Sequence, residues 1–281
     1  MATSDPRTDL PQHDADADVR WHAVLVGDEK HAPGLARLRR IFRHLPSGPR
    51  CKLCYAPYAA PFGPVVGRLG FGRWSKNPSL CGSCLRIMER AQGGAEVELS
   101  MLFADLRGST QLAAGMSASA YSHLLNGFYR TAAEAVEDRG GSIDKYLGDG
   151  VFALFIPGFA GTDHAARAIE AARQILRNTE QPDGSPLPVG IGVHTGMAYV
   201  GVVGSSGDLT DFTALGDPVN ITSRLSAVAA ARELLVSDAA LAVSGLSNGE
   251  LTRRVVELKG VARPMTVWSE VVGLAAPVSA R

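Results

Sequence analysis

The chain has 281 residues, of which 46% are hydrophobic and 20% charged, so it is long and apolar enough to bury a core. Its longest apolar stretches, around Val151–Phe155 and Tyr199–Val203, fall far short of the roughly 18 consecutive apolar residues of a spanning helix, which excludes a transmembrane protein. The acidic N-terminus lacks the basic and then apolar pattern of a signal peptide, so we expect a cytoplasmic protein.

Charge divides the chain into segments, although the formal net charge is 0. Residues 1–29 hold seven acids and two bases, and residues 30–88 hold eleven bases and no acid. The remainder carries 15 bases and 21 acids. We therefore expect a disordered acidic tail over 1–29, a basic helix with a cysteine module and linker helix over 30–94, a larger domain over 95–275 and a short tail over 276–281.

The basic segment begins with a predicted helix. Its apolar residues recur at helical spacing between arginines, and Pro46 and Gly48 end the pattern; they are Leu35, Leu38, Ile41, Phe42 and Leu45. Many glycines and prolines follow, which exclude a long helix between residues 51 and 81. We expect the apolar stripe of the helix to pack on the cysteine module.

All four cysteines occur as two Cys-x-x-Cys pairs, Cys51 with Cys54 and Cys81 with Cys84, separated by 26 residues. In a reducing compartment this pattern indicates a metal site, and four thiolates suit Zn²⁺ or an iron–sulfur cluster. A structural Zn²⁺ site is the first interpretation. A cluster that makes the module a redox or gas sensor is the second, and unligated or disulfide-switching cysteines are the third.

The basic run also admits binding to nucleic acid or an anionic membrane. The sequence shows no recognition-helix motif, and docking on the acidic domain of the same chain explains the charges equally well. Nucleic acid is therefore an unlikely partner.

From Val97 onward, strand and helix patterns alternate. Strands are predicted at 97–106, 142–147, 151–155, 188–194 and 198–203, and helices at 121–136 and 161–177. The last two strands are expected to join across Thr195-Gly196. This β-α-β-β-α-β order predicts an α+β fold, with a ferredoxin-like antiparallel sheet and helices on one face.

Two aspartates lie at strand ends of this predicted sheet. Asp105 ends the first strand, before a loop of small residues whose backbone N–H groups can bind phosphate at a helix start. Asp149 lies in the hairpin turn Gly148-Asp149-Gly150. Their carboxylates together can hold Mg²⁺ ions over a triphosphate, although each alone is equally typical of a turn. Later in the chain, Asn220 and Arg224 lie four residues apart on one helix face.

These stretches resemble a known family. The matching segments are LFADLRGST at 102–110, DKYLGDG at 144–150, GIGVHTG at 190–196, FTALGDPVNITSR at 212–224 and LKG at 258–260. Over Val97–Val272 the chain resembles the catalytic domain of the class III adenylyl and guanylyl cyclases. The resemblance implies an adenylyl cyclase, which converts ATP into 3′,5′-cyclic AMP and pyrophosphate by in-line attack of the 3′-hydroxyl on the α-phosphate.

The resemblance also implies roles for individual residues. Asp105 and Asp149, with the backbone of Leu106, would bind two Mg²⁺ or Mn²⁺ ions, and the loop from Leu106 through Arg107 to Gly108 would face the phosphates. Asn220 would orient the ribose and Arg224 would stabilise charge on the α-phosphate. Lys259 would reach the terminal phosphates, or would be a solvated loop lysine. Arg107 departs from relatives that have an apolar residue there.

Two further positions match the family's purine-reading pair. Lys145 can donate to adenine N1, and the oxygen of Thr213 can accept from the exocyclic amine. Guanine would require the opposite polarity, so the pair indicates ATP.

In the family, the active site forms between two subunits. We expect a head-to-tail homodimer in which one chain supplies the metal aspartates and Lys145, and the other supplies Asn220 and Arg224. A monomer would be nearly inactive, and the cysteine module would regulate the dimer. The alternatives are a catalytically silent regulator that binds nucleotides or nucleic acid on this fold, and a guanylyl cyclase.

Overall fold

A computed structural model of the protein describes residues 15–46, 48–74, 79–91, 93–181, 183–204, 211–249 and 251–273. The helices are α1 Ala15–Val26, α2 Pro33–Phe42, α3 Gly63–Val66, α4 Gly82–Ala91, α5 Ser109–Ala114, α6 Ala118–Asp138, α7 Pro157–Ala160, α8 His164–Asn178, α9 Asp217–Val228 and α10 Asp238–Ser244, with a π-helical turn at Gly67–Phe71. The strands are β1 Gly93–Leu106, β2 Ser142–Leu147, β3 Gly150–Phe155, β4 Val189–Val203, β5 Asp211–Leu215, β6 Glu233–Ser237, β7 Thr252–Val256 and β8 Met265–Val271. Among the described helices, none is both long and apolar enough to cross a membrane.

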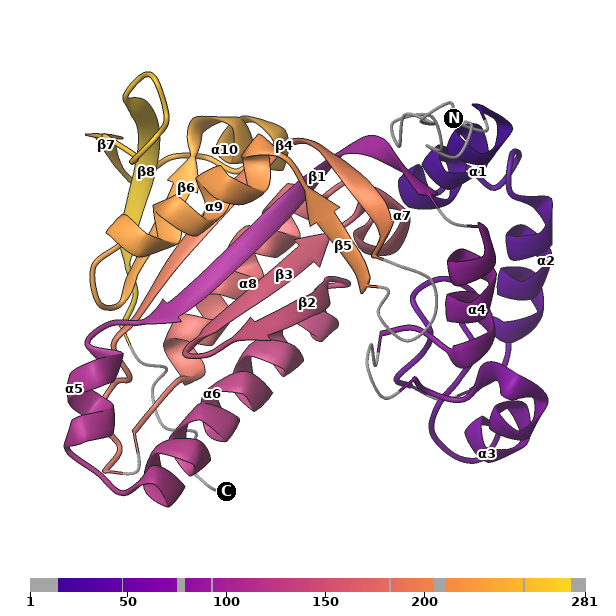
Figure 1. Ribbon diagram of the computed structural model, residues 1–281, viewed down its shortest axis with the longest axis horizontal. Helices are drawn as coiled ribbons and strands as arrows, with labels where there is room; N and C mark the ends of the chain where they lie inside the picture. The colour runs from indigo at the N-terminus through magenta and orange to yellow at the C-terminus, as the bar shows by residue number, and fades with distance from the viewer. Residues whose placement is uncertain are drawn as a thin grey trace, which may run out of the picture.

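The strands form one mixed sheet in the order β2-β3-β1-β4-β6-β8-β7, and β5 pairs with the far end of β4 (Figure 1). Neighbouring strands are antiparallel except for β4 and β6. Helices α6, α8 and α10 pack on one face of the sheet, and α9 lies on the other face (Figure 1). The predicted α+β architecture with a ferredoxin-like antiparallel core is confirmed.

Alternation along β1 shows why the sheet has two buried faces. Leu102, Ala104 and Leu106 belong to the core beneath α6 and α8, whereas Leu99 and Met101 belong to the core on the opposite face. Because successive side chains of a strand point to opposite sides, a nearly continuous apolar strand must be covered twice. The central position of β1 follows from this requirement.

Strand β4 differs from the expectation that two strands join across Thr195-Gly196. It runs without a break from Val189 to Val203, and Thr195 and Gly196 pair with Ser100 and Leu99 of β1. The hydroxyls of Thr195 and Ser100 lie 2.6 Å apart and are buried. Pairing with a neighbouring strand of equal length therefore outweighs the local turn signal.

Helix α9 packs unusually close to β4. A side chain at Gly192 would bring its Cβ to within 2.4 Å of the backbone nitrogen of Ser226, so only glycine allows this approach. The helix begins beside Gly196, where a Cβ would lie 3.0 Å from Pro218, and ends beside Gly190. The axis of α9 is thus fixed along six residues of β4.

The N-terminal segment corrects the prediction of a disordered tail over 1–29. Residues 15–26 form α1, whose Trp21 is 5% exposed and stacks on Phe212 of β5 with ring centroids 6.3 Å apart. Leu25, one helical turn later, is fully buried in the same core. The acidic composition of residues 1–29 indicates disorder, and two apolar residues alone do not predict a helix. They are buried because the sheet lies against them. Residues 1–14 and the predicted tail at 276–281 lie outside the described residues.

Candidate active site and metal centre

The two predicted metal-binding aspartates come together at one end of the sheet. Asp105 is paired with Gly150 across β1 and β3, and the N–H of Leu106 donates to the backbone oxygen of Asp149 over 3.2 Å. Gly148, with φ of +64°, allows the tight turn that carries Asp149 back toward β1. Tyr129 of α6 donates to the carbonyl of Gly148 and holds this turn.

The electrostatics of this pair suit a cation. Burial raises the pKa of Asp105 above its ordinary value, Arg107 opposes the shift, and the charge of Asp149 adds to it. Arg107 Nη1 lies 3.2 Å from Asp105 Oδ2, and its Nη2 donates to the backbone oxygen of Ser226 over 2.6 Å. A guanidinium thus already balances the Asp105 carboxylate, and hard oxygen donors of this kind fit Mg²⁺ or Mn²⁺.

Fewer backbone N–H groups of the predicted phosphate loop are free to bind phosphate than the sequence indicates. The N–H groups of Leu106 and Arg107 donate to the carbonyls of Asp149 and Pro188, so they are occupied. The chain turns at Gly108, with φ of +66°, directly into α5. The N–H of Gln111 already donates to the carbonyl of Gly108 over 2.9 Å, so the amides from Gly108 to Thr110 are the part of the loop that can face phosphate.

Asn220, Arg224 and Lys259 gather elsewhere on the chain. Asn220 is exposed in the first turn of α9. The guanidinium of Arg224 lies over Gly260, where a Cβ would be 3.2 Å from Nη2, and Lys259 is the exposed neighbour of that glycine. The loop between β7 and β8 thus places Lys259 next in sequence to the glycine that the Arg224 guanidinium covers.

This group is well separated from the aspartates. Pro218, at the start of α9, is near Gly196 of β4, whereas Asp105 pairs with Gly190, and six residues of extended strand span about 20 Å. Arg224 turns toward the β7–β8 loop, and β8 lies three strand positions from β1, about 14 Å across the sheet. In one chain, the aspartates and the start of α9 therefore lie at opposite ends of this stretch of β4.

Lys145 and Thr213 lie side by side, although they come from strands far apart in the sheet order. The hydroxyl of Thr213 donates to Asp144 Oδ2 over 2.9 Å, and Lys145 Nζ lies 3.3 Å from the same oxygen. Lys145 Nζ also donates to Asp211 Oδ2 over 2.8 Å. Burial lowers the pKa of Lys145, but the two carboxylates outweigh it and leave that pKa raised.

Sequence reasoning missed Asp144 and Asp211. Strict alternation along β2 places Asp144 and Lys145 on opposite faces, but the register of β2 against β3 shifts between Ile143 and Lys145. Such a bulge lets consecutive side chains turn toward one partner. In the sequence, the only local sign that Asp144 belongs to this site is that a carboxylate stands next to Lys145, and that sign does not predict the bulge that turns both side chains to one partner.

Asp144 gives a pH-dependent prediction. Burial raises its pKa from 3.8 to about 6, partly opposed by Lys145 and Thr213. The unfolded chain ionises this group more easily, so the folded state loses about 3 kcal/mol as pH rises from 4 to above 6. Asp144→Asn is expected to gain that amount relative to the wild type between pH 4 and pH 8, measured by urea unfolding. A stability difference that is the same at both pH values would contradict the buried carboxylate's raised pKa.

The four cysteines form the second candidate site. Their sulfur atoms all lie within 4.8 Å of one another, those of Cys54 and Cys81 are 3.7 Å apart, and all four residues are buried. No disulfide joins them. Hydrogen bonds from Cys54 and Cys81 hold the pKa of Cys51 well below its ordinary value, whereas bonds to Cys51 raise the pKa values of Cys54 and Cys84. Although its hydrogen bond with Cys51 raises the pKa of Cys81, hydrogen bonds from Cys54 and Cys84 outweigh it and leave that pKa lowered as well. Thiols that already share hydrogen bonds in this way are a ligand set that a metal cation would bind as thiolates.

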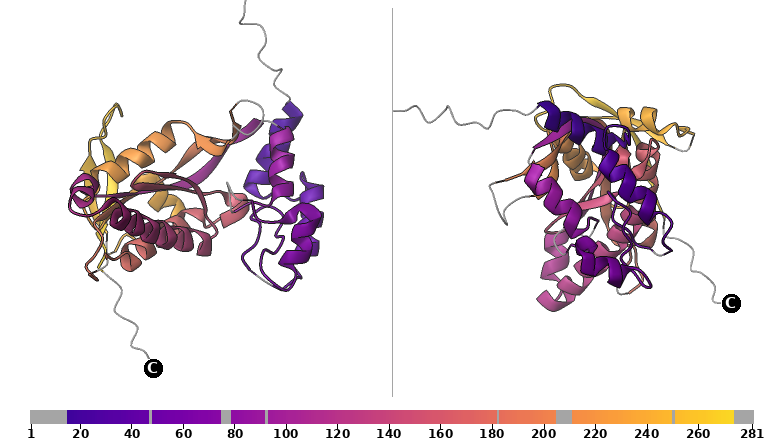
Figure 2. Two further views of the ribbon diagram at one scale, coloured as in Figure 1. Left: turned by 60° about the horizontal axis from the view of Figure 1, so that its bottom comes forward. Right: turned by 90° about the vertical axis from the view of Figure 1, so that its right-hand side faces the viewer.

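The cysteine module docks on the sheet domain through basic side chains. Lys52 Nζ donates to the backbone oxygen of Glu137 over 3.0 Å, at the C-terminal end of α6, and Arg73 lies 3.3 Å from the Glu137 carboxylate. Arg39 is 5% exposed and bridges Leu53 of the module to Gly158 of α7. Cations at a helix C-terminus are favoured by its dipole and its free carbonyls. Figure 2 shows the module against this end of the domain.

Residues 93–275 match the family described as the Adenylate and Guanylate cyclase catalytic domain. The chain belongs to this cyclase family. The cyclase is 36% identical over 135 residues to an adenylate cyclase of Anabaena cylindrica, which covers 45% of this chain and 26% of that protein. It is 31% identical over 191 residues to an uncharacterised protein, Rv1318c, of Mycobacterium tuberculosis, covering 66% of this chain and 34% of that protein.

Two solved structures share the fold of the cyclase domain. The guanylyl cyclase Cya2 aligns with a TM-score of 0.57 and 29% identity, over 66% of this chain and 98% of that one. The adenylyl cyclase CyaB from P. aeruginosa aligns with a TM-score of 0.56 and 27% identity, over 62% of this chain and 93% of that one. The chain spans only about a quarter to a third of the two curated relatives, so the similarity concerns the catalytic domain.

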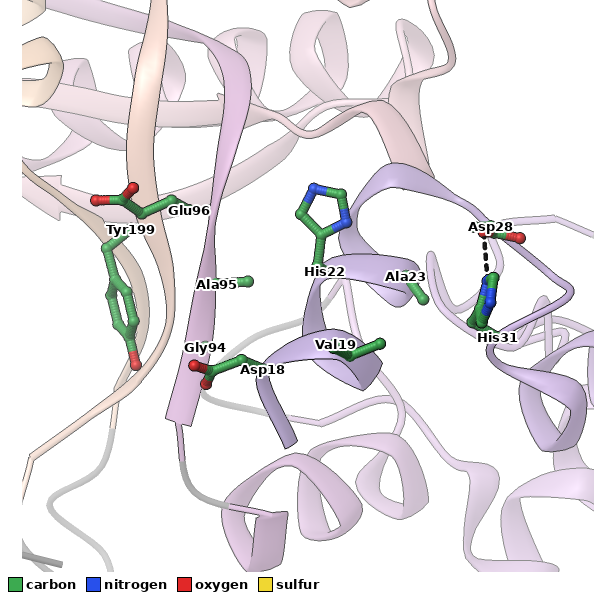
Figure 3. Close-up of a pocket in the computed structure, with 10 residues that line it drawn as sticks. All are labelled: Asp18, Val19, His22, Ala23, Asp28, His31, Gly94, Ala95, Glu96 and Tyr199. Carbon is green, nitrogen blue, oxygen red and sulfur yellow. Dashed lines mark hydrogen bonds and ion pairs between the residues drawn. The ribbon is translucent and has the colours of Figure 1, made fainter. Parts of the chain in front are cut away.

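A cavity of about 710 Å³ in this cyclase lies between α1, the start of β1 and Tyr199 of β4 (Figure 3). Asp18 and His22 border it, and His31 hydrogen-bonds to Asp28 at its edge with Nδ1 and Oδ2 2.7 Å apart. None of the predicted catalytic residues lines it. It lies at the opposite end of β1 from Asp105.

Proposed function

We propose that the protein is an adenylyl cyclase, which forms 3′,5′-cyclic AMP and pyrophosphate from ATP. The observation that carries this proposal is that Lys145 and Thr213 bond to the same oxygen of Asp144 in one chain, while the metal aspartates lie together at another end of the sheet. Family membership supplies the reaction class, and these side chains supply the preference for the purine.

The reaction needs charge stabilisation at both ends of the phosphoryl transfer. Mg²⁺ or Mn²⁺, when bound at Asp105 and Asp149, lowers the charge on the attacking and leaving oxygens. Asn220 orients the ribose so that its 3′-hydroxyl is in line, and Arg224 donates to the α-phosphate oxygens as negative charge develops. The amides from Gly108 onward and Lys259 hold the phosphates that leave as pyrophosphate.

The purine preference follows from hydrogen-bond polarity. The ammonium of Lys145 can only donate, which suits the unprotonated N1 of adenine, and the oxygen of Thr213 can accept from the 6-amino group. Guanine offers an N1–H and a carbonyl oxygen at these positions, so both contacts would be mismatched. ATP is therefore the substrate that this pair supports.

The separation of the half-sites supports a head-to-tail homodimer with two equivalent active sites. Asp105 and Asn220 must both reach one nucleotide, yet Asp105 and the start of the helix that carries Asn220 lie about 20 Å apart along β4 in a single chain. The expected division of residues changes in one respect. Lys145 and Thr213 share Asp144 as a partner, and the strand of Thr213 leads directly into α9, so we assign Lys145 to the half-site of Asn220 and Arg224 rather than to that of the aspartates.

The cysteine module fits a single Zn²⁺ ion. Zinc–sulfur bonds of about 2.3 Å place tetrahedral sulfur ligands about 3.8 Å apart, close to the spacing that the chain already shows. An iron–sulfur cluster distributes its thiolates over several iron atoms and needs a wider spacing. Four reduced cysteines also agree with the cytoplasmic location expected from the sequence.

The docking contacts support regulation of the cyclase by this module. Lys52 and Arg73 hold the C-terminal end of α6, and the same helix holds the Asp149 turn through Tyr129. Loss of the metal would release one end of a helix whose other residues position a metal ligand. Lys52, Arg73 and Arg39 are engaged by the chain itself, which favours internal docking over nucleic-acid binding.

The function is tested by incubating the purified full chain with ATP or GTP and Mg²⁺ or Mn²⁺, and by separating the products. We expect cyclic AMP with equimolar pyrophosphate, and a kcat/KM for ATP at least about tenfold above that for GTP, since one mismatched hydrogen bond costs 1–3 kcal/mol. Predominant cyclic GMP would identify a guanylyl cyclase. Nucleotide binding without either product, in a confirmed dimer with both metals, would identify a silent regulator.

A further inference from the structure

Asp144 ties together the two side chains that read the purine. Its carboxylate is fully buried, and Oδ2 takes both the Thr213 hydroxyl, at 2.9 Å, and the Lys145 ammonium, at 3.3 Å. Its second oxygen, Oδ1, is buried without a hydrogen-bond partner among the described residues. A carboxylate that is buried with one unsatisfied oxygen is costly for the fold, so its position calls for a functional explanation.

The carboxylate determines what Thr213 can offer to a ligand. A hydroxyl has one proton to donate and two lone pairs to accept, whereas an ionised carboxylate only accepts. The proton of Thr213 must therefore point to Asp144, as the 2.9 Å contact shows. Only lone pairs remain on the threonine oxygen, so toward any third group it is an acceptor.

The same carboxylate limits Lys145. An ammonium has three N–H donors, and the carboxylates of Asp144 and Asp211 take two of them. One donor remains, and Lys145 is about one-third exposed, so this donor is available to a ligand. Lys145 and Thr213 thus present one donor and one acceptor, in an order that Asp144 fixes.

We infer that Asp144 is a specificity-determining positioning residue, which makes Thr213 an obligate acceptor and so selects a 6-aminopurine over a 6-oxopurine. The inference rests on the proposed function, in that Lys145 and Thr213 read the base. Threonine alone does not discriminate, because a free hydroxyl can rotate and donate to the O6 of guanine as readily as it accepts from the N6 of adenine. Discrimination arises only when a neighbour consumes its proton.

The test compares two substitutions at Asp144 in the full-length dimer. Asp144→Leu keeps the approximate volume but removes the acceptor, so we expect the ratio of kcat/KM for ATP to that for GTP to fall about 10- to 100-fold. The change should reside mainly in KM, because the base is bound equally in ground and transition states. Asp144→Asn retains an oxygen that the Lys145 ammonium orients toward itself and Thr213, so it should preserve the preference for ATP.

A double substitution separates specificity from a structural role. Thr213→Val removes the hydroxyl, and adding Asp144→Leu to it should change the ATP-to-GTP ratio no further. A merely structural Asp144 would instead lower both activities in parallel in either background. Asp183→Asn, at an exposed turn where the carboxylate bonds to Ser185, is the matched control and should leave the ratio unchanged.

Each outcome decides a different question. The inference is overturned, and the proposed function stands, if the wild-type protein prefers ATP and a folded Asp144→Leu protein has the same ATP-to-GTP ratio of kcat/KM. Wild-type preference for GTP overturns the proposed function itself. If Asp144→Leu does not fold, Asp144→Ala takes its place. If turnover is lost, the affinities for non-cyclisable α,β-methylene analogues of ATP and GTP, measured by calorimetry, give the same ratio.

Discussion

Replacing Asp105 by Asn is expected to lower the rate of cyclic AMP formation by at least about a thousandfold, because it removes a charged ligand from the metals that stabilise the transferring phosphate. The side chain keeps its size, and Arg107 loses one partly exposed ion pair but keeps its bond to the backbone of Ser226, so the fold should remain intact. The measurement is cyclic AMP produced per dimer at saturating Mn²⁺. Asp183→Asn serves as the control, with wild-type rates expected.

Mixing two inactive variants tests whether the site is shared between subunits. Arg224→Ala should also be nearly inactive, since it removes the guanidinium that neutralises the α-phosphate. In an equal mixture that exchanges subunits, half the dimers are mixed, and each of these has one intact site, so activity should return to about one quarter of the wild type. A mixture as inactive as its parents, in a proven heterodimer, would place both half-sites in the same chain.

Replacing Cys81 by Ser is expected to have the second largest effect. Zinc content should fall from about one ion per chain to nearly none, because structural zinc sites depend on all four ligands and contribute several kcal/mol to folding. The residues of the module then lose the centre around which Cys51, Cys54 and Cys84 pack. Metal analysis and limited proteolysis between residues 30 and 92 report these changes.

The control for this prediction is Ser83→Ala, which lies between Cys81 and Cys84 and leaves four thiols in place. If the wild-type protein is brown, contains iron and absorbs visible light, the four cysteines hold an iron–sulfur cluster instead of zinc, and the module becomes a sensor candidate. The regulatory proposal fails separately if Cys81→Ser and Cys84→Ser leave cyclase activity and dimerisation unchanged in a folded protein. We expect the activity to change severalfold, since the end of α6 loses Lys52 and Arg73.

Much of the catalytic domain is readable from local patterns. The strand and helix order, the Asp149 turn and the close approach of Cys51 to Cys84 all depend on short-range spacing or turn chemistry, which the sequence displays directly. The roles of Asn220 and Arg224 came from motif resemblance, and the structure adds that the start of α9 and Asp105 lie at opposite ends of one stretch of β4.

What the sequence could not show depends on tertiary contacts. Helix α1 was expected to be part of a tail, because its two buried residues, Trp21 and Leu25, are buried only through packing against β5 and β1, which the sequence does not show. The continuous β4 was missed because Thr195-Gly196 resembles a turn until β1 lies beside it. Asp144 was missed because a bulge, and not alternation, orients it. In each case a distant partner overrides a local rule.

The distance of about 20 Å along β4 between Asp105 and the start of α9 has a kinetic consequence. If neither half-site works alone, turnover depends on the fraction of chains that are paired. Below the dissociation constant of the pair, the rate of product formation rises with the square of the chain concentration, and dilution silences the enzyme without any inhibitor. The abundance of the protein would then itself act as an input signal.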